Sequence, residues 1–252
     1  SFARMGLTWW CSVLATHMIS VREPLVSVLQ AYPPWARLSA DFDRRWATTR
    51  RGNKRTRAAL TGFSRGWSPI DFTFDVGLQM REGDACSVVS RSAAQTDLCR
   101  RERRGDLNLS DALGVVRGAG VTRGSLYLAT DSKQVVDAAA RGAAAPFEVF
   151  YLDIDRKQYD IGPHDSKSQI EHTNSLARRR TILVETLLDV LLLSRSNLIV
   201  GKMMSNLPRL AVVLRVQDPS PRYVSLDNRP WCAQTSCRWR AAAGTLPDAY
   251  FA

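Results

Sequence analysis

Residues Thr181 to Arg209 read TILVETLLDVLLLSRSNLIVGKMMSNLPR. The first half is apolar on nearly every side, as expected of a helix enclosed by a core. Glu185 and Asp189 interrupt it four residues apart, a spacing that places both carboxylates on one face. A carboxylate among leucines is costly unless a partner binds it. The stretch therefore predicts a buried helix whose carboxylates have specific partners. Glu185 would face a basic group, and Asp189 would bind either a ligand or an arginine such as Arg195 or Arg209.

A strand, a loop and a helix start follow this helix. The pattern predicts a strand over 197–201, a loop over 202–206, and a helix over 206–216 with Pro208 in its first turn. Ser205 or Asn206 is the expected N-cap. Free N–H groups and the helix dipole at such a junction favour anions. We expect the 202–206 loop to hold phosphates while Asp189 binds the neutral donor edge of the same ligand.

The composition is that of a globular chain that can bury a core. It has 252 residues, 45% of them hydrophobic and 23% charged, with a formal net charge of +11. The positive charge suits a nucleic acid, an anionic membrane or a phosphorylated ligand. We interpret the arginine clusters as solvated surface, because no zinc-finger or RNA-binding signature accompanies them. No specific nucleic-acid partner is expected.

Targeting, membrane and cysteine signals bear on the compartment in which the protein works. The longest apolar run is broken by Glu185 and Asp189 and is too short to span a bilayer. The chain starts at Ser1 with no signal peptide, which suggests a fragment. Five cysteines lack metal-ligand spacing, and two readings stay open: short Cys86–Cys99 and Cys232–Cys237 disulfides, or reduced thiols.

Strand and helix signals alternate along the chain. Helix patterns cover 6–31, with a restart at Glu23-Pro24, and 176–193. Two further helices are expected, one capped by Ser110 and ending near Arg117, the other capped by Asp131 or Ser132 and ending near Ala140. Strand patterns cover 72–80, 125–129, 147–152, 197–201 and 224–226. Residues 33–69 read as an irregular connection. The alternation predicts an α/β fold with βαβ units and a mainly parallel sheet.

Ligands of such sheets bind beyond the carboxyl ends of the strands. This edge would carry polar side chains and a loop: Arg81, Asp84, Thr130, Asp131, Asp153 and residues 201–206.

Four stretches in order resemble the α1,6-fucosyltransferase family, which is related to the protein O-fucosyltransferases. They are GLTWW from Gly6, VGLQMREGD from Val76 to Asp84, YLATD from Tyr127 to Asp131, and Asp189 to Arg209. The second is similar to the family's strand ending in His-x-Arg-Arg-x-Asp. The resemblance covers roughly residues 6–230, with 33–70 and 87–107 poorly matched.

The resemblance implies the C-terminal, Rossmann-like nucleotide-binding half of a GT-B glycosyltransferase. Its expected parts are a helical lead-in (1–32), an irregular basic connection (33–70), the GDP-sugar-binding domain (71–230) and a C-terminal tail (231–252). The implied donor is GDP-fucose without an obligatory metal, the acceptor is a glycan or glycoprotein hydroxyl, and the location is the Golgi lumen. The anchor and the N-terminal half that helps form the acceptor cleft would lie outside this chain.

The resemblance also assigns roles to residues. Arg81 and Asp84 match the motif's arginine and aspartate and are the expected catalytic pair, with Arg81 on phosphate. Asp189 matches the carboxylate that accepts from guanine N1–H and N2–H₂. The remaining expected GDP-fucose ligands are Gln79, Asp131, Ser205 and Asn206.

Several positions depart from the family. Gln79 replaces the motif's histidine, Glu82 its second arginine and Ala85 its lysine, and the family's candidate base falls at Val89. An inverting transfer needs a base near the acceptor hydroxyl, and Asp97 or Glu102 could supply it if the loop folds back. These departures motivate an alternative, a GDP-sugar-binding protein without turnover. A second alternative, a basic nucleic-acid-binding protein, rests on charge alone.

Overall fold

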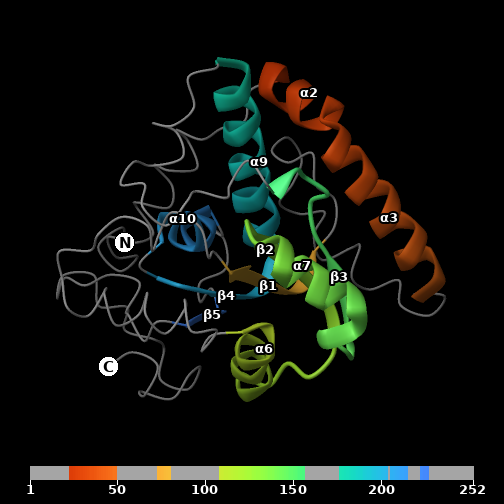
Figure 1. Ribbon diagram of the computed structural model, residues 1–252, viewed down its shortest axis with the longest axis vertical. Coiled ribbons are helices and arrows are strands. Elements are labelled where there is room, and N and C mark those ends of the chain that lie inside the picture. The colour runs from red at the N-terminus through yellow and green to blue at the C-terminus, as the bar shows by residue number, and fades with distance from the viewer. Residues whose placement is uncertain are drawn as a thin grey trace, which may run out of the picture.

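The computed structural model describes residues 23–49, 73–80, 108–156, 176–203, 205–214 and 222–226. These residues form an α/β fold in which helices cover both faces of a single sheet (Figure 1). The strands are β1 (Phe74–Met80), β2 (Gly124–Thr130), β3 (Phe147–Phe150), β4 (Ser196–Gly201) and β5 (Arg222–Ser225).

All five strands are parallel, in the spatial order β3-β2-β1-β4-β5. Val76 at the centre lies opposite Leu126 on one side and Leu198 on the other. The central strands are nearly continuous apolar runs because they are buried on both faces. The predicted parallel sheet is confirmed, and its order is Rossmann-like, with the direction of strand addition reversing between β1 and β4.

One face of the sheet is covered by α2 (Glu23–Ala31), α3 (Pro33–Thr49), α9 (Leu176–Ser194) and α10 (Asn206–Leu214). Their apolar side chains pack on Phe74, Tyr127 and Ile199 of the strands. Gly77 lets both Ser196 at the start of β4 and the end of α9 approach closely, because a Cβ there would lie 2.9 Å from Ser196 Cβ and 3.0 Å from Leu193 Cδ2. This face also holds the two carboxylates of α9.

The opposite face is covered by α6 (Leu109–Gly118), α7 (Lys133–Ala138) and the π-helical segment η3 (Ala139–Ala143). Its core is apolar and is built on Val76, Leu78 and Leu128. The α6 helix is capped by Asn108 and not by the predicted Ser110. Asn108 Oδ1 accepts from the Asp111 N–H, and Asp111 Oδ2 accepts from the Asn108 N–H, which closes a capping box.

The α3 helix corrects the prediction of an irregular connection from residue 33. Pro33 occupies the first helical position, where its missing N–H leaves no bond unmade. Trp35, Leu38 and Phe42 follow at helical spacing, and all three are buried. Charged residues obscure this stripe in the sequence: Arg37 and Asp41 lie within it, and Asp43, Arg44 and Arg45 follow it. Burial of the stripe in the core therefore outweighs the charged composition.

The α9 helix matches its predicted span, but the expectation of burial on every side is wrong. Ile182, Leu188 and Leu192 are buried, whereas Leu183 is 58% exposed. The helix packs against one face of the sheet, so its opposite flank, which carries Leu183, stays exposed. None of the described helices combines the length and apolarity needed to cross a bilayer.

Candidate functional site

The carboxyl ends of β1 and β4 meet where the strand order reverses, the usual ligand position in such sheets. Gln79 is 1% exposed there, and its Oε1 accepts from the Lys202 N–H at 3.3 Å. A Cβ at position 201 would lie 3.0 Å from Pro208 Cβ and 3.2 Å from Gln79 Cβ. Gly201 thus allows α10 and the Gln79 side chain to pack closely against the backbone there. The predicted ligand residue Gln79 uses its carbonyl to hold the loop after β4.

The start of α10 lies at this same point. Ser205 Oγ accepts from the Leu207 N–H at 3.4 Å, so Ser205 is the N-cap of the two residues predicted. Pro208 falls in the first turn, as expected. The Ser205 N–H donates to Lys202 O at 3.0 Å. Among the described residues, the backbone N–H of the exposed Asn206 has no acceptor. Because the N–H groups of Ser205 and Leu207 are already used, this end offers an anion fewer N–H groups than the sequence predicts.

Asp189 is the second part of the site. Its Oδ1 accepts from the hydroxyl of Tyr127 in β2 at 2.5 Å, and not from Arg195 or Arg209, the alternative partners that the sequence offered. Burial raises the pKa of the Asp189 carboxyl from 3.8 to about 7. The Tyr127 hydrogen bond and the Arg156 charge act against that rise, while the charges of Glu185 and Asp131 add to it. Asp189 therefore changes its charge near neutral pH.

The same contact affects the pKa of Tyr127. Burial, followed by the charge and hydrogen bond of Asp189, raises the pKa of its phenol well above 10.0. The phenol thus stays protonated and keeps donating to Asp189. Strongly perturbed groups at a ligand-binding edge are candidates for function.

Glu185 lies one turn from Asp189 and has a different partner. It is 2% exposed, and its Oε1 accepts at 2.5 Å from the hydroxyl of Tyr32, between α2 and α3. This hydrogen bond comes from a neutral phenol, whose pKa is raised by burial and by Glu185. The contact joins α9 to the α2–α3 pair.

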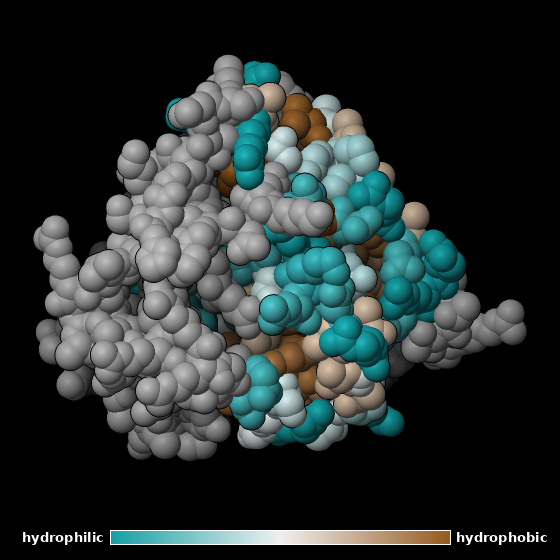
Figure 2. Space-filling model, viewed as in Figure 1, coloured by the Kyte–Doolittle hydropathy of each residue, from teal (hydrophilic) through white to brown (hydrophobic). Residues whose placement is uncertain are grey.

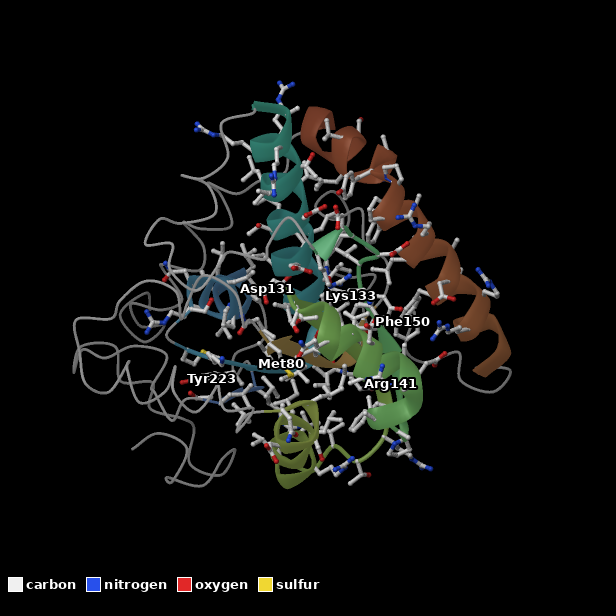
Figure 3. The ribbon with its side chains drawn as sticks, in the orientation of Figure 1. Met80, Asp131, Lys133, Arg141, Phe150 and Tyr223 are labelled. Carbon is white, nitrogen blue, oxygen red and sulfur yellow. The ribbon has the colours of Figure 1, made fainter. Side chains whose placement is uncertain are left out.

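Asp131 follows β2 directly at the carboxyl edge. Of the two residues predicted to cap α7, Ser132 is the cap, since its Oγ accepts from the Val135 N–H at 3.4 Å. Asp131 is partly exposed and is near enough to Asp189 to raise its pKa. Figure 3 shows Asp131 beside the start of α7, with Met80 marking the end of β1. Figure 2 shows mostly hydrophilic side chains on the described surface over α7.

Sequence reasoning missed Tyr127 and Arg156 as site residues. Tyr127 lies in the YLATD motif, but its donor role depends on a residue 62 positions away. Arg156 is 8% exposed and donates to three backbone carbonyl oxygens, of Thr130, Leu152 and Ile154. It comes from a polar stretch in which nothing local marks it.

The structure brings the predicted residues into two groups along one edge of the sheet. Gln79, Ser205 and Asn206 lie at the β1–β4 reversal, and Asp131 and Asp189 lie beside β2. Arg81 and Asp84 lie outside the described residues, as do positions 82, 85, 89, 97 and 102 and all five cysteines.

The fold and the site define an α/β protein with a Rossmann-like parallel sheet and a polar carboxyl edge. No family model matches the chain, and no curated protein matches it either.

Proposed function

We propose that the carboxyl edge of the sheet binds GDP-fucose and that the chain is a fucosyltransferase-like glycosyltransferase. It would be the nucleotide-binding half of a GT-B enzyme of the Golgi lumen, working with an N-terminal half outside this sequence. The proposal joins the family resemblance to one observation, the environment of Asp189.

Asp189 is suited to read a guanine. Tyr127 holds one carboxylate oxygen, and no hydrogen bond to the other is found among the described residues. A carboxylate can accept from guanine N1–H and N2–H₂ together, and two such bonds would offset the cost of its buried charge. With a pKa of about 7, Asp189 is ionised on the alkaline side of neutrality, where it can accept both bonds.

The diphosphate would lie at the β1–β4 reversal. The α10 N-terminus contributes the Asn206 N–H and its dipole, and Lys202 is the basic residue that follows β4 in the same loop. In the sequence Arg81 comes directly after β1, which ends at Met80 at this edge. Positive groups there would stabilise the charge that builds on the β-phosphate as the sugar leaves.

The reaction would be a direct displacement. The acceptor hydroxyl oxygen forms a bond to the fucose anomeric carbon as the bond from that carbon to the β-phosphate oxygen breaks. The bonding pair leaves with GDP, the configuration at the carbon inverts, and the acceptor proton passes to a general base. Arg81 and Asp84 are the proposed catalytic residues.

A thermal-shift panel tests donor binding. GDP and GDP-fucose should raise the melting temperature while UDP and ADP should not, because only guanine offers the two donors. Asp189→Ala should abolish the effect. Glu185→Gln is the matched control, since it alters the neighbouring carboxylate on the same helix and should leave the GDP effect in place. Equal protection by GDP and UDP would refute the guanine assignment.

A GDP-sugar-binding protein without turnover is the second candidate. Gln79 stands where the family has a histidine, and its carbonyl oxygen already accepts from Lys202 N–H. It can neither carry charge nor transfer a proton. Release of GDP from GDP-fucose in the presence of glycan acceptors separates the two, because this second candidate predicts protection by GDP-fucose without GDP release.

A further inference from the structure

Arg156 is a buried cation at the carboxyl ends of β2 and β3. Its Nε donates to Thr130 O at 3.2 Å, its Nη1 to Ile154 O at 3.3 Å and its Nη2 to Leu152 O at 2.7 Å. The guanidinium also lies over the Tyr151 ring, 5.6 Å from its centroid. These contacts fix its position tightly.

The carbonyl contacts do not account for the charge or for all of the donors. A guanidinium has about five N–H donors, and three are used. Within the described part of the chain, no acceptor takes the other two and no carboxylate forms a direct ion pair with Arg156. A neutral donor would suffice to hold backbone carbonyls, so these contacts do not require the positive charge of Arg156. Burying that charge carries a desolvation cost. The remaining donors and the charge are suited to a ligand.

Arg156 and Asp189 are near each other without direct contact. The positive charge of Arg156 favours the ionised form of Asp189 and acts on Tyr127 as well. No salt bridge joins the two among the described residues. The structure thus places a guanidinium donor and a carboxylate acceptor on neighbouring positions of one edge of the sheet.

We propose that Arg156 is a specificity-determining residue that donates to guanine O6 while Asp189 accepts from N1–H and N2–H₂. This inference rests on the proposed function and adds the second half of the base recognition. Guanine presents one acceptor and two donors along this edge, and the two side chains complement them. Adenine presents an amino donor at position 6 and an acceptor at N1, so both contacts would be mismatched.

The test compares GDP with 6-thio-GDP, in which sulfur, a weak acceptor, replaces O6 while both donors stay. The wild-type chain should bind GDP about tenfold more tightly, the effect of one hydrogen bond to a charged group. Arg156→Met removes the donors and should bring the ratio of the two dissociation constants close to one. A purely structural Arg156 would leave the ratio unchanged even where both affinities fall.

Arg45 on α3 provides a matched control. It donates to Val149 O of β3 at 3.3 Å and lies over the Phe150 ring, 5.1 Å from its centroid. Arg45→Met therefore removes a similar carbonyl and ring contact away from the carboxyl edge. It should keep the wild-type preference for GDP.

The outcomes distinguish failure of the Arg156 role from failure of the proposed function. A wild-type chain that binds no guanine nucleotide overturns both. GDP binding without a preference over 6-thio-GDP, or an Arg156→Met variant that retains the preference, overturns the role of Arg156 alone. If Arg156→Met does not fold, the wild-type ratio still decides, since equal affinity for the two nucleotides is incompatible with a donor to O6.

Discussion

Glu185 and Asp189 lie one turn apart on α9, and each accepts a 2.5 Å hydrogen bond from a tyrosine hydroxyl. Tyr32 reaches Glu185 from the junction of α2 and α3, so this pair fastens one helical layer to another. Tyr127 reaches Asp189 from β2, beside Arg156 and the carboxyl edge. Two similar contacts therefore have different consequences: one joins elements of the fold, and the other keeps a carboxylate poised near neutral pH where a ligand would bind.

The largest expected effect is a pH-dependent gain of stability in Asp189→Asn. Because the folded pKa is about 7 and the unfolded value 3.8, the unfolded chain loses this proton first as pH rises. The carboxyl therefore lowers the unfolding free energy of the wild type. This loss is absent below about pH 4, grows between pH 4 and pH 7, and reaches roughly 4 kcal/mol above pH 7. The variant has no charge at this position and avoids that loss.

Denaturant unfolding across this pH range measures the effect. The difference in unfolding free energy, Asp189→Asn minus wild type, should rise between pH 4 and pH 7 and then level off. A difference that does not vary with pH would show that Asp189 has an ordinary pKa. All other titrating groups are common to both proteins and cancel.

Glu185→Ala tests the other member of the pair. It opens a cavity between α9 and α2 and leaves the Tyr32 hydroxyl without this acceptor. We expect a loss of about 3 kcal/mol in unfolding free energy. Binding of GDP to the folded fraction should persist. Loss of GDP binding in a folded Glu185→Ala chain would mean that the two carboxylates form one site.

Substitutions of the two tyrosines test the same comparison, with a smaller expected change in unfolding free energy than those of the carboxylates. Tyr127→Phe removes a hydrogen bond that lowers the pKa of Asp189, so the Asp189 titration should move above pH 7 and stability should fall by about 1–2 kcal/mol. Tyr32→Phe should leave that titration where it is. Carboxyl chemical shifts of Asp189 followed by NMR report both, and equal shifts in the two variants would contradict the assignment.

Leu183→Ala should have the smallest effect. Leu183 is 58% exposed on the same helix, and substitutions at such positions change stability by about 0.5 kcal/mol or less. Leu188→Ala, at a position with no exposure, is the buried counterpart and should cost about 2–5 kcal/mol. A large loss at Leu183, measured by denaturant unfolding, would show that another surface covers it.

Much of the fold can be predicted because it depends on local pattern. Continuous apolar runs mark β1, β2 and β4, and the strand–helix alternation implies parallel pairing. The α3 helix does not stand out in the sequence, because charged residues such as Arg37 and Asp41 interrupt the stripe of Trp35, Leu38 and Phe42. The stripe becomes informative once a core is available to receive it.

The site is predictable only where a residue is anomalous in its own surroundings. Asp189 draws attention as a charge among leucines, and Gln79 as a polar residue in a buried strand. Tyr127 and Arg156 do not, because their roles depend on partners 62 and 26 residues away. Contacts of that kind arise from the topology of the sheet, which brings β2 beside α9 and its end beside the segment that follows β3.

Calorimetric titration of GDP into wild type and Asp189→Asn at about pH 8 and pH 6 tests the central claim, that Asp189 reads a guanine, most directly. Wild type should lose about tenfold more affinity between the two pH values than the variant, because its ionised fraction falls about tenfold across a pKa of 7. Titration of the nucleotide phosphate is common to both and cancels. The variant should bind GDP weakly at both pH values. Wild-type affinity in Asp189→Asn, with the same pH dependence, would contradict the account.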